Sequence, residues 1–255
     1  MRVLVVLPTF QEVANIDAVL RKLRGAVPEA SILVVDDNSP DGTAEMAEKV
    51  GADVGAIDVL RRPGKAGLGS AYRDGFRWGL DRGFEAFVEM DSDLSHDPAA
   101  VAGLIERLGE GFDVVVGSRY VAGGSIPAWS WHRRLISRVG NVYAATLLGL
   151  SKMTDLTSGF RAYRAEILRK IDVASVTAES YAFQIEMVHR AVLAGGKVTE
   201  IPIRFVDRVE GRSKMSLFTI IEALGLVTLW GLRRLFRRER WALGTRSSGG
   251  TAGPA

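Results

Sequence analysis

Two carboxylates one residue apart, Asp91 and Asp93, directly follow a short apolar segment of the chain, Phe87-Val88-Glu89-Met90. Such a run predicts a buried strand, and a strand that stops on Asp-x-Asp places both acids at its carboxyl end, where open α/β sheets bind ligands. Two neighbouring acids in such a place repel each other and lose solvation, so they favour a cation. Oxygen ligands, in a chain with no cysteine and three histidines, suit a hard ion such as Mg²⁺ or Mn²⁺. Because such an ion commonly holds a diphosphate, the segment indicates nucleotide chemistry.

Two further apolar runs end on polar residues that suit a nucleoside. The first is followed by Pro8-Thr9-Phe10-Gln11-Glu12, in which Pro8 restricts the backbone while Phe10 and Glu12 can face a base and its ribose. The second ends on Val34-Val35-Asp36-Asp37, before a turn, Ser39-Pro40-Asp41-Gly42, that leads into a helix. One of the adjacent acids can bind ribose hydroxyls or a base edge, and the other can hold the turn. We interpret Asp37 as a ligand and Asp41 as a cap.

Two basic segments offer partners for phosphate: Gly117-Ser118-Arg119-Tyr120 and Arg208-Val209-Glu210-Gly211-Arg212-Ser213-Lys214. An arginine fork binds two phosphate oxygens and a lysine offers a compact charge, so these residues could hold a second anionic group opposite an Asp–metal site. The alternative is a solvated basic loop. The glycine-rich residues 62–72 match neither common nucleotide motif, since Ala66 follows Lys65 where a P-loop needs Ser or Thr, and Tyr72 takes the last glycine position of GxGxxG.

The elements that position these residues alternate along the first 120 residues. Short runs rich in Val, Ile and Leu predict buried parallel strands at Arg2–Leu7, Ser31–Asp36, Ile57–Arg61, Ala86–Met90 and Asp113–Gly117. Helical apolar spacing lies between them, at Asn15–Leu23, Gly42–Val50, Gly67–Arg82 and Pro98–Leu108, the last with Asp97 as its N-cap. This alternation predicts a doubly wound α/β sheet.

The later half of the chain has a different pattern. Trp129–Leu150 and Ala182–Ala194 are predicted helices, and Lys197–Phe205 is a predicted edge strand because it contains Pro202. Leu217–Leu232 is strongly apolar but shorter than the roughly 20 residues that span a bilayer, and it leads into an arginine-rich segment, Arg233–Arg240. We expect residues 241–255, rich in Gly, Ser and Ala, to form a disordered tail.

Composition limits the possibilities further. A chain of 255 residues that is 47% hydrophobic can bury one substantial core, and we expect a single domain at residues 1–240. The absence of cysteine excludes disulfides, thiolate metal sites and a cysteine nucleophile.

The two halves of the chain differ in charge. Residues 1–120 contain 13 Lys and Arg against 20 Asp and Glu, a net charge of −7, whereas residues 121–255 contain 20 against 10, a net charge of +10. The later half therefore suits phosphate, nucleic acid or anionic lipid. The apolar run before Pro8 is too short for a signal peptide, so we expect a cytoplasmic protein.

Together the motifs resemble those of the dolichyl-phosphate and polyprenyl-phosphate mannose synthases, which are family two glycosyltransferases with the GT-A fold. The resemblance extends from Val3 to about Lys214 and is most specific in DLSHDP and in DRVEGRSKM, whereas Asp-x-Asp occurs in many sugar transferases. Further matching segments are LPTFQE, VVDDNSPDGTA, GKAGLGSAYRDGF, VVGSRYV, TDLTSGFRAYR and YAFQIEM.

The resemblance implies GDP-mannose as donor, a polyprenyl monophosphate as acceptor and Mg²⁺ or Mn²⁺ as cofactor, with no role for nucleic acid. It also implies a nucleotide-binding half at residues 1–120 and an acceptor-facing half at residues 121–240. The residues at donor-binding positions are Pro8, Phe10, Glu12, Val35, Asp37, Ser92, Asp93, Arg119, Arg208 and Lys214, and those at metal positions are Asp91, Asp93 and Ser95. The catalytic set is Asp91, Asp93, Arg119, Arg208 and Lys214. Some relatives have Gln at the position of Ser95, so a direct contact with metal and one through water both stay open.

A mechanism follows from the charges. A metal at Asp91 and Asp93 would stabilise the departing diphosphate. The acceptor phosphate, whose second pKa is about 6, is already anionic at neutral pH and needs no strong base. We therefore interpret His96 as local support rather than as a base. Direct displacement would invert the anomeric centre of the sugar. Asp155 could bind sugar hydroxyls or support the structure.

A lipid acceptor would explain the positive charge of the later half of the chain. Trp129–Leu150 and Leu217–Arg240 could lie in a bilayer interface or pack as core helices. We expect peripheral association with the cytoplasmic face of a membrane, directly or through an anchoring partner protein. Two other functions stay open: transfer of glucose from UDP-glucose to the same lipid, and a non-catalytic module that binds anionic lipid and whose acids cap turns.

Overall fold

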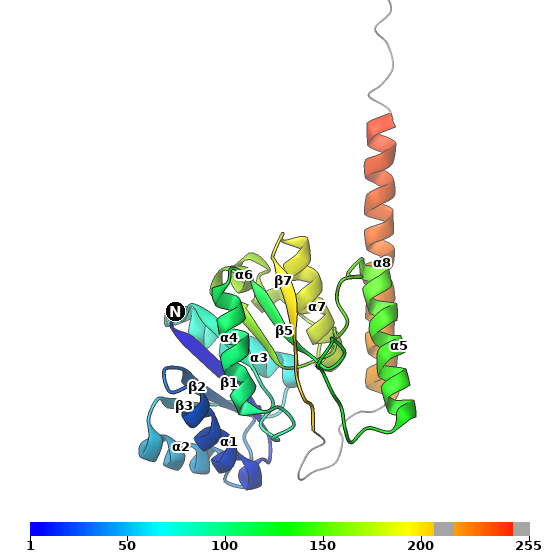
Figure 1. Cartoon of the computed structure of the whole chain (residues 1–255). Helices are drawn as coiled ribbons and strands as arrows, with labels where there is room; N and C mark the ends of the chain where they lie inside the picture. The colour runs from blue at the N-terminus through cyan, green and yellow to red at the C-terminus, as the bar shows by residue number, and fades with distance from the viewer. Residues whose placement is uncertain (207–216, 247–255) are drawn as a thin grey trace, which may run out of the picture.

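The computed structural model describes residues 1–206 and 217–246 as a seven-stranded sheet with helices on both faces (Figure 1). The strands are β1 (Val3–Thr9), β2 (Ser31–Asp36), β3 (Ile57–Arg61), β4 (Ala86–Glu89), β5 (Val114–Ser118), β6 (Arg161–Arg164) and β7 (Val198–Pro202). The helices are α1 (Val13–Ala26), α2 (Thr43–Val54), α3 (Leu68–Asp81), α4 (Val101–Gly109), α5 (Trp131–Leu148), α6 (Ala165–Lys170), α7 (Ser180–Leu193) and α8 (Leu217–Arg246), with short 3-10 helices at Pro98–Ala100 and Val173–Ser175.

The strand order is β3-β2-β1-β4-β6-β5-β7. Strands β3, β2, β1 and β4 are parallel neighbours, β5 and β7 are parallel, and β6 runs antiparallel to both β4 and β5. The predicted α/β sheet is confirmed, and β2 and β3 have the predicted bounds. Strand β7 is at the edge, as Pro202 predicted. Strand β6 was not predicted, and β3 is half-exposed rather than buried because it forms the opposite edge.

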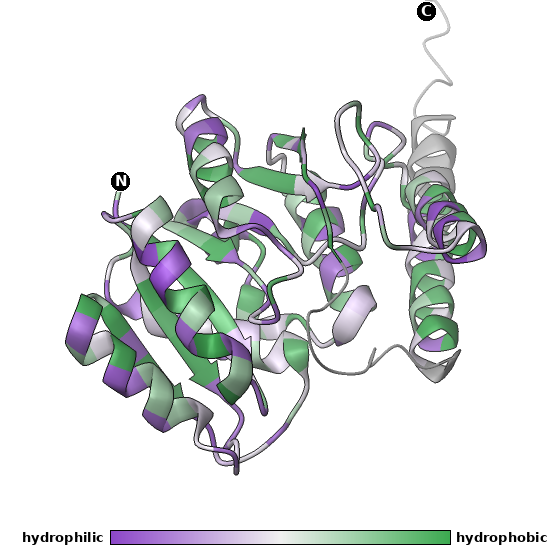
Figure 2. Ribbon diagram, turned by 60° about the horizontal axis from the view of Figure 1, so that its bottom comes forward, coloured by the Kyte–Doolittle hydropathy of each residue, from purple (hydrophilic) through white to green (hydrophobic). Residues whose placement is uncertain are grey.

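Alternating side chains of the strands form two apolar layers, one on each face of the sheet. On β1, Val3, Val5 and Leu7 pack with α1, α2 and α4, whereas Leu4 and Val6 pack with α3 and α7 on the other face. Figure 2 shows the strands as mainly hydrophobic between helices whose outer sides are hydrophilic. The carboxyl ends of β1, β2 and β4 therefore lie side by side at one edge of a rigid core.

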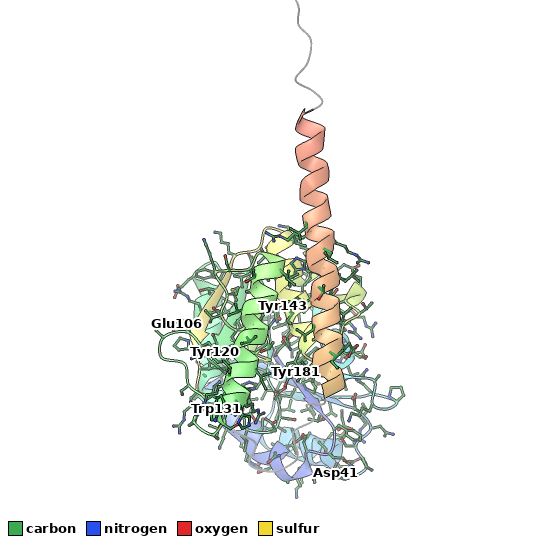
Figure 3. All side chains as sticks on the ribbon, turned by 90° about the vertical axis from the view of Figure 1, so that its right-hand side faces the viewer. Asp41, Glu106, Tyr120, Trp131, Tyr143 and Tyr181 are labelled. Carbon is green, nitrogen blue, oxygen red and sulfur yellow. The ribbon has the colours of Figure 1, made fainter. Side chains whose placement is uncertain are left out.

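Helices α5 and α8 lie side by side at the end of the molecule next to α7 (Figures 1 and 3). The Tyr143 hydroxyl is 2.7 Å from the Thr228 hydroxyl, and Arg234 donates to the carbonyl of Leu147. Each helix has an inner side in the core, with Leu148 and Val227 among the buried residues, and an outer side that is exposed. Packing in the core is thus confirmed for the inner sides, and a position in a bilayer interface stays a prediction for the exposed outer sides.

One expectation about the end of the chain needs adjustment. Helix α8 continues to Arg246, so residues 241–246 are helical and do not belong to a tail; residues 247–255 lie outside the described part of the chain. Within the described residues, every helix is too short or too polar to cross a bilayer.

The close packing of α3 on the sheet gives a stability prediction. A Cβ at Gly79 would stand 2.4 Å from Phe87 Cε1 and 2.6 Å from Leu4 Cδ2, both in the core. Because the sheet cannot recede, we expect Gly79→Ala to lower the free energy of unfolding by about 1–3 kcal/mol in urea titrations. The matched control is Gly140→Ala in α5, where nothing lies within 4 Å of the new Cβ. That change should raise the free energy by about 0.5–1 kcal/mol. Equal effects of the two substitutions would contradict the packing described.

Candidate active site

A cavity of about 580 Å³ opens where the carboxyl ends of β1, β2, β4 and β5 meet the first turn of α7. It gathers predicted site residues from four separate segments of the sequence. Those that line it are Pro8, Phe10, Glu12, Asp37, Asp91, Ser92, Asp93 and Arg119. The acidic residues after β4 and the arginine after β5 therefore face one space, as a site for a metal and phosphates requires.

Two predicted residues do not line this cavity, and two others lie outside the described residues. The Val35 side chain is fully buried in the core, next to Gly75 of α3, so it does not reach the cavity. Ser95 is 1% exposed, and its hydroxyl is buried without a hydrogen-bond partner and does not line the cavity. Arg208 and Lys214 lie outside the described residues.

The turns after β1 and β2 are held together by acids that do not face a ligand. Asp36 accepts hydrogen bonds from the Thr9 hydroxyl at 2.9 Å and the Ser39 backbone N–H at 2.8 Å. Asp41 accepts from the backbone N–H groups of Val13 and Thr43, at 3.2 and 3.1 Å. Asp41 thus has a structural role, since it joins the first residues of α1 and α2, although the N-cap position of α2 is Gly42. Asp36 is the acid that holds the turn.

Asp37 forms the wall of the cavity at the β2 end. Its carboxylate pairs with Arg62, which is itself bound to Asp74 at 2.9 Å and is nearly buried. Burial raises the pKa of Asp37 and the Arg62 guanidinium lowers it, with a net upward shift. Asp37 is thus held rigidly at the cavity, and its role as a ligand stays a prediction.

The segment after β4 is a strained turn. Leu94 has φ +60°, which a branched side chain rarely adopts, and this lets the Ser95 N–H donate to Asp93 Oδ1 at 3.0 Å. The Ser92 hydroxyl donates to the Pro8 carbonyl at 3.1 Å and so fixes this turn against the end of β1. Positive φ values also occur at Gln11 and Ser180, beside other lining residues. Strain of this kind costs about 1–3 kcal/mol for each residue and is common in binding sites.

The donor set around Asp91 and Asp93 fits a hard divalent ion. Both carboxylates line the cavity, and among the described residues no third His, Cys, Asp or Glu completes a protein-only metal cluster. His96 Nδ1 is 3.9 Å from Asp91 Oδ2, and its ring stacks on Phe160 with centroids 5.0 Å apart. Burial lowers the pKa of His96 to about 4, so its imidazole is neutral at pH 7. The remaining ligands would be diphosphate or water oxygens.

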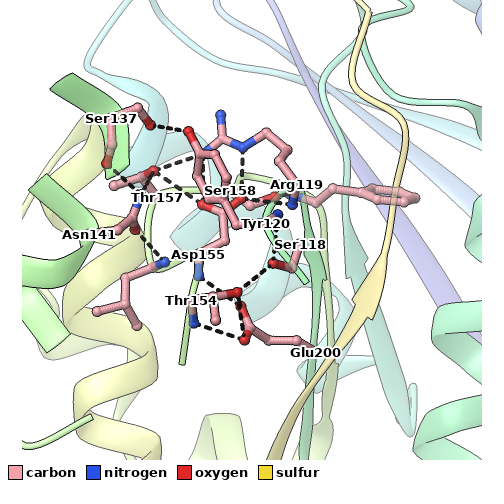
Figure 4. Close-up of polar contacts among 12 residues, drawn as sticks. Ser118, Arg119, Tyr120, Ser137, Asn141, Thr154, Asp155, Thr157, Ser158 and Glu200 are labelled. Atoms are coloured by element: carbon pink, nitrogen blue, oxygen red, sulfur yellow. Dashed lines mark hydrogen bonds and ion pairs between the residues drawn. The ribbon is translucent and has the colours of Figure 1, made fainter. Parts of the chain in front are cut away.

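Arg119 is held by Asp155 (Figure 4). Asp155 Oδ2 accepts from the Arg119 backbone N–H at 3.0 Å and from Nε at 2.7 Å, and Oδ1 accepts from Nη2 at 2.7 Å. Burial raises the pKa of Asp155, but the contacts with Arg119 together lower it by more, so the net shift is downward. Of the two alternatives for Asp155, these contacts favour structural support.

A second layer of contacts holds the Asp155 loop in place. Glu200 of β7 accepts hydrogen bonds from the backbone N–H groups of Thr154 and Asp155, at 2.8 and 2.7 Å. Asn141 of α5 accepts from the Leu156 N–H at 2.7 Å (Figure 4). The position of Arg119 thus depends on β7 and α5, which are far from it in the sequence.

Several lining residues were not predicted as site residues. Lys65 Nζ lies 4.7 Å from the Phe10 ring centroid, and the Arg133 guanidinium lies 3.9 Å from the Trp129 ring centroid. Glu179 accepts from the backbone N–H groups at the start of α3, and Gln184 is buried in the cavity lining. Lys65 and Gln184 lie in segments that match the family motifs, GKAGLGSAYRDGF and YAFQIEM, but neither was predicted to have a role.

The chain matches the profile of glycosyl transferase family 2 over residues 4–172. The chain belongs to this family. It is 45% identical to an undecaprenyl-phosphate mannosyltransferase of Micrococcus luteus, over 96% of this chain and 100% of the relative. It is 44% identical to a polyprenol monophosphomannose synthase of Mycolicibacterium smegmatis, over 94% and 90% of the two chains.

Solved structures show the same fold at low identity. One is the glucosyl-3-phosphoglycerate synthase of Mycobacterium tuberculosis in complex with Mn²⁺ and UDP-glucose, with a TM-score of 0.63 and 20% identity over 91% of this chain and 78% of that one. Another is the mannosyltransferase of Pyrobaculum calidifontis in complex with GDP-mannose and Mn²⁺, with a TM-score of 0.57 and 17% identity over 98% and 76% of the chains.

These comparisons confirm the resemblance predicted from the motifs. This member of glycosyl transferase family 2 has a GT-A-type fold and is a glycosyltransferase. The alternative of a non-catalytic lipid-binding module is therefore wrong. The roles of the individual site residues stay predictions.

The Arg119–Asp155 pair gives a prediction with a pH signature. Asp155→Asn leaves a buried guanidinium without its counter-charge, so the free energy of unfolding at pH 7 should fall by about 3–5 kcal/mol, with loss of transferase activity. The folded pKa of Asp155 lies below the unfolded value of about 3.9, so its contribution is present above that pH and is lost as pH falls through the folded pKa.

The difference in the free energy of unfolding between wild type and Asp155→Asn should therefore become smaller as the pH falls. Urea titrations at several pH values would measure it. Asp53→Asn is the control, because Asp53 is 61% exposed in its pair with Arg21. Its substitution should change the free energy of unfolding little. Equal stability of wild type and Asp155→Asn at pH 7 would rule out the supporting role.

Proposed function

We propose that this chain transfers mannose from GDP-mannose to the phosphate of a polyprenyl monophosphate, with inversion at the anomeric carbon. The observation that carries the proposal is one cavity lined by Asp91 and Asp93 on one side and Arg119 on the other. It is supported by relatives at 45% and 44% identity that are named for mannosyl transfer to polyprenyl phosphate, and by the fold of a GDP-mannose complex. UDP-glucose is the alternative donor, since a structure of the same fold binds it.

The donor would lie along the ends of β1, β2 and β4. The base and ribose would face Phe10, Glu12 and Asp37, which line one end of the cavity, and the diphosphate would lie at Asp91 and Asp93. Lys65, above the Phe10 ring, would add a cation beside the nucleotide. Cations near the diphosphate favour its binding through charge-assisted hydrogen bonds.

Asp91 and Asp93 would hold Mg²⁺ or Mn²⁺, which when bound supplies Lewis-acid stabilisation of the leaving diphosphate. The Ser95 N–H keeps Asp93 in place through its hydrogen bond to Oδ1. Ser95 Oγ is buried away from the cavity lining, which favours water rather than this hydroxyl as a further ligand.

The acceptor phosphate would be placed by Arg119 and Arg133, both in the cavity lining. Its oxygen is anionic at neutral pH, since a phosphate monoester has a second pKa of about 6, so it can attack without a general base. His96, with a pKa of about 4, is neutral and buried, in agreement with a supporting role. Two phosphates of like charge approach each other here, and the arginines offset their repulsion.

The exposed side of α5 and α8 suits a membrane surface (Figure 3). Trp131, Leu135 and Val139 of α5 are 75%, 53% and 59% exposed and share one side of the helix, while Ile221 and Leu232 of α8 are 59% and 47% exposed. Arginines at positions 134 and 138 flank this apolar face, as in helices that lie at the interface of anionic bilayers. We propose that this face places the chain peripherally on the cytoplasmic side of a membrane, where the lipid acceptor resides, directly or through an anchoring partner protein.

Asp93→Asn tests the reaction. Loss of one metal carboxylate should lower kcat for transfer of labelled mannose from GDP-mannose to polyprenyl phosphate roughly 100-fold or more, and should weaken Mn²⁺ binding measured by electron paramagnetic resonance. The control is Asp97→Asn, because Asp97 caps a 3-10 helix outside the cavity lining and should leave transfer unchanged. Full activity of Asp93→Asn would contradict the mechanism. Tighter calorimetric binding of UDP-glucose than of GDP-mannose would instead favour the alternative donor.

The membrane face gives a separate prediction. Leu135→Ser should lower partition onto vesicles containing anionic phospholipid about tenfold, because an apolar side chain no longer inserts. Leu193→Ser, at the end of α7, is the matched control: this leucine is 65% exposed and belongs to neither α5 nor α8. Equal partition of the two variants in vesicle sedimentation would argue against this face as the contact surface.

A further inference from the structure

Gln184 of α7 is a buried polar residue in the lining of the cavity. It is 2% exposed, and neither atom of its side-chain amide makes a hydrogen bond of normal geometry. A buried amide without partners costs about 1–3 kcal/mol, so it needs an explanation. A ligand that enters the cavity would supply the missing partners.

The position of Gln184 is fixed by the fold. Its backbone carbonyl accepts a hydrogen bond from the fully buried Arg161. The same guanidinium donates to the carbonyls of Ser158 and Leu156, each at 2.7 Å. One side chain thus holds α7 against the loop that precedes Gly159, and the backbone of α7 at Gln184 cannot move away from the cavity without breaking this arrangement.

Gly159 leaves open the space between Gln184 and the predicted metal site. A Cβ at Gly159 would stand 3.7 Å from Gln184 Nε2 and 3.8 and 3.9 Å from the two carboxylate oxygens of Asp91. These are ordinary contact distances, and Gly159 does not have a positive φ, so neither crowding nor backbone conformation requires glycine. Since Gly159 also lines the cavity, a ligand group could occupy the point between the amide and Asp91.

Away from the cavity, the polar group next to the Gln184 amide is the carboxyl of Glu89. The fully buried Glu89 carboxyl lies close enough to Gln184 to interact with it, but its own oxygens also lack a hydrogen bond of normal geometry. A single carboxyl can use only part of the hydrogen-bonding capacity of an amide, which has two N–H groups and an acceptor oxygen. The rest of that capacity is available toward the cavity, which Gln184 lines and Glu89 does not.

We propose that the Gln184 amide binds a hydroxyl group of the hexosyl unit of the donor and thereby contributes to the choice of sugar. The inference rests on the proposed function, because it takes the donor to be a nucleotide sugar with its diphosphate at Asp91 and Asp93. The sugar is the next group along the donor, and the open point beside Asp91 lies next to the amide. An amide has one acceptor and two donor positions, which suit a sugar hydroxyl. A site built around such a bond rejects analogues that lack the hydroxyl.

The test is Gln184→Met, which keeps the volume and removes both polar atoms. Wild type and variant would be compared with GDP, GDP-mannose and the series of monodeoxy GDP-mannose donors. The binding of GDP should be unchanged, and kcat/KM for GDP-mannose should fall roughly 5- to 100-fold. The wild type should discriminate against one deoxy donor in particular, and this discrimination should vanish in the variant. Thermal stability should stay equal or rise, since an unsatisfied buried amide is replaced by an apolar group.

The control is Ile185→Met, at a core-facing position of the same helix, which should keep the discrimination among deoxy donors. Two results would overturn the proposal: kcat/KM unchanged in Gln184→Met, or equal losses with every donor together with weaker binding of GDP. A wild-type chain that uses neither GDP-mannose nor UDP-glucose would contradict the proposed function. An active wild type whose deoxy-donor preferences persist in Gln184→Met would contradict only the role of Gln184.

Discussion

The arrangement of the site depends on one buried ion pair, Arg119 with Asp155. A guanidinium taken out of water loses several kcal/mol of solvation, and the bidentate carboxylate recovers this only if its geometry is maintained. That condition extends outward, because the Asp155 loop is itself held by Glu200 of the edge strand and by Asn141 of α5. A cation directed at the cavity thus requires the correct assembly of elements from both halves of the chain.

The antiparallel strand β6 makes this assembly possible. It pairs with β4 on one side and β5 on the other, so the loop that leads into it passes between the carboxylates after β4 and Arg119 after β5. The loop must lie close to β5: a Cβ at Gly117 would stand 2.8 Å from Phe160 Cδ1. The carboxylates after β4 and the guanidinium after β5 therefore reach the cavity from two strands that are separated by β6.

Much of the sheet was predictable because parallel buried strands have a direct hydrophobic signature, and the acids that end them follow by position. Strand β6 was not predictable, because Arg161 and Arg164 are not typical of a buried strand. Arg161 is buried because three backbone carbonyls accept its N–H groups. Backbone acceptors of this kind cannot be recognised from the sequence. Val35 was assigned to the site by family position, although the two-residue period of a strand already places it on the α3 side with Leu33. Gln184 was missed because a glutamine in a helix has no periodic signal.

The polar groups around Asp91 show how stability is distributed in this fold. On the opposite face of the sheet, α1 and α4 bury aliphatic side chains against β1, and nothing in that layer depends on a ligand. Next to Asp91, by contrast, His96 Nδ1 and the Gln184 amide belong to lining residues and are buried without a hydrogen bond of normal geometry, and Leu94 has a strained backbone. Each feature makes the unliganded chain less stable than an apolar packing would. A ligand that supplies partners to these groups binds the folded state alone and stabilises it by mass action, so part of its affinity comes from satisfying polar groups that the fold has already buried.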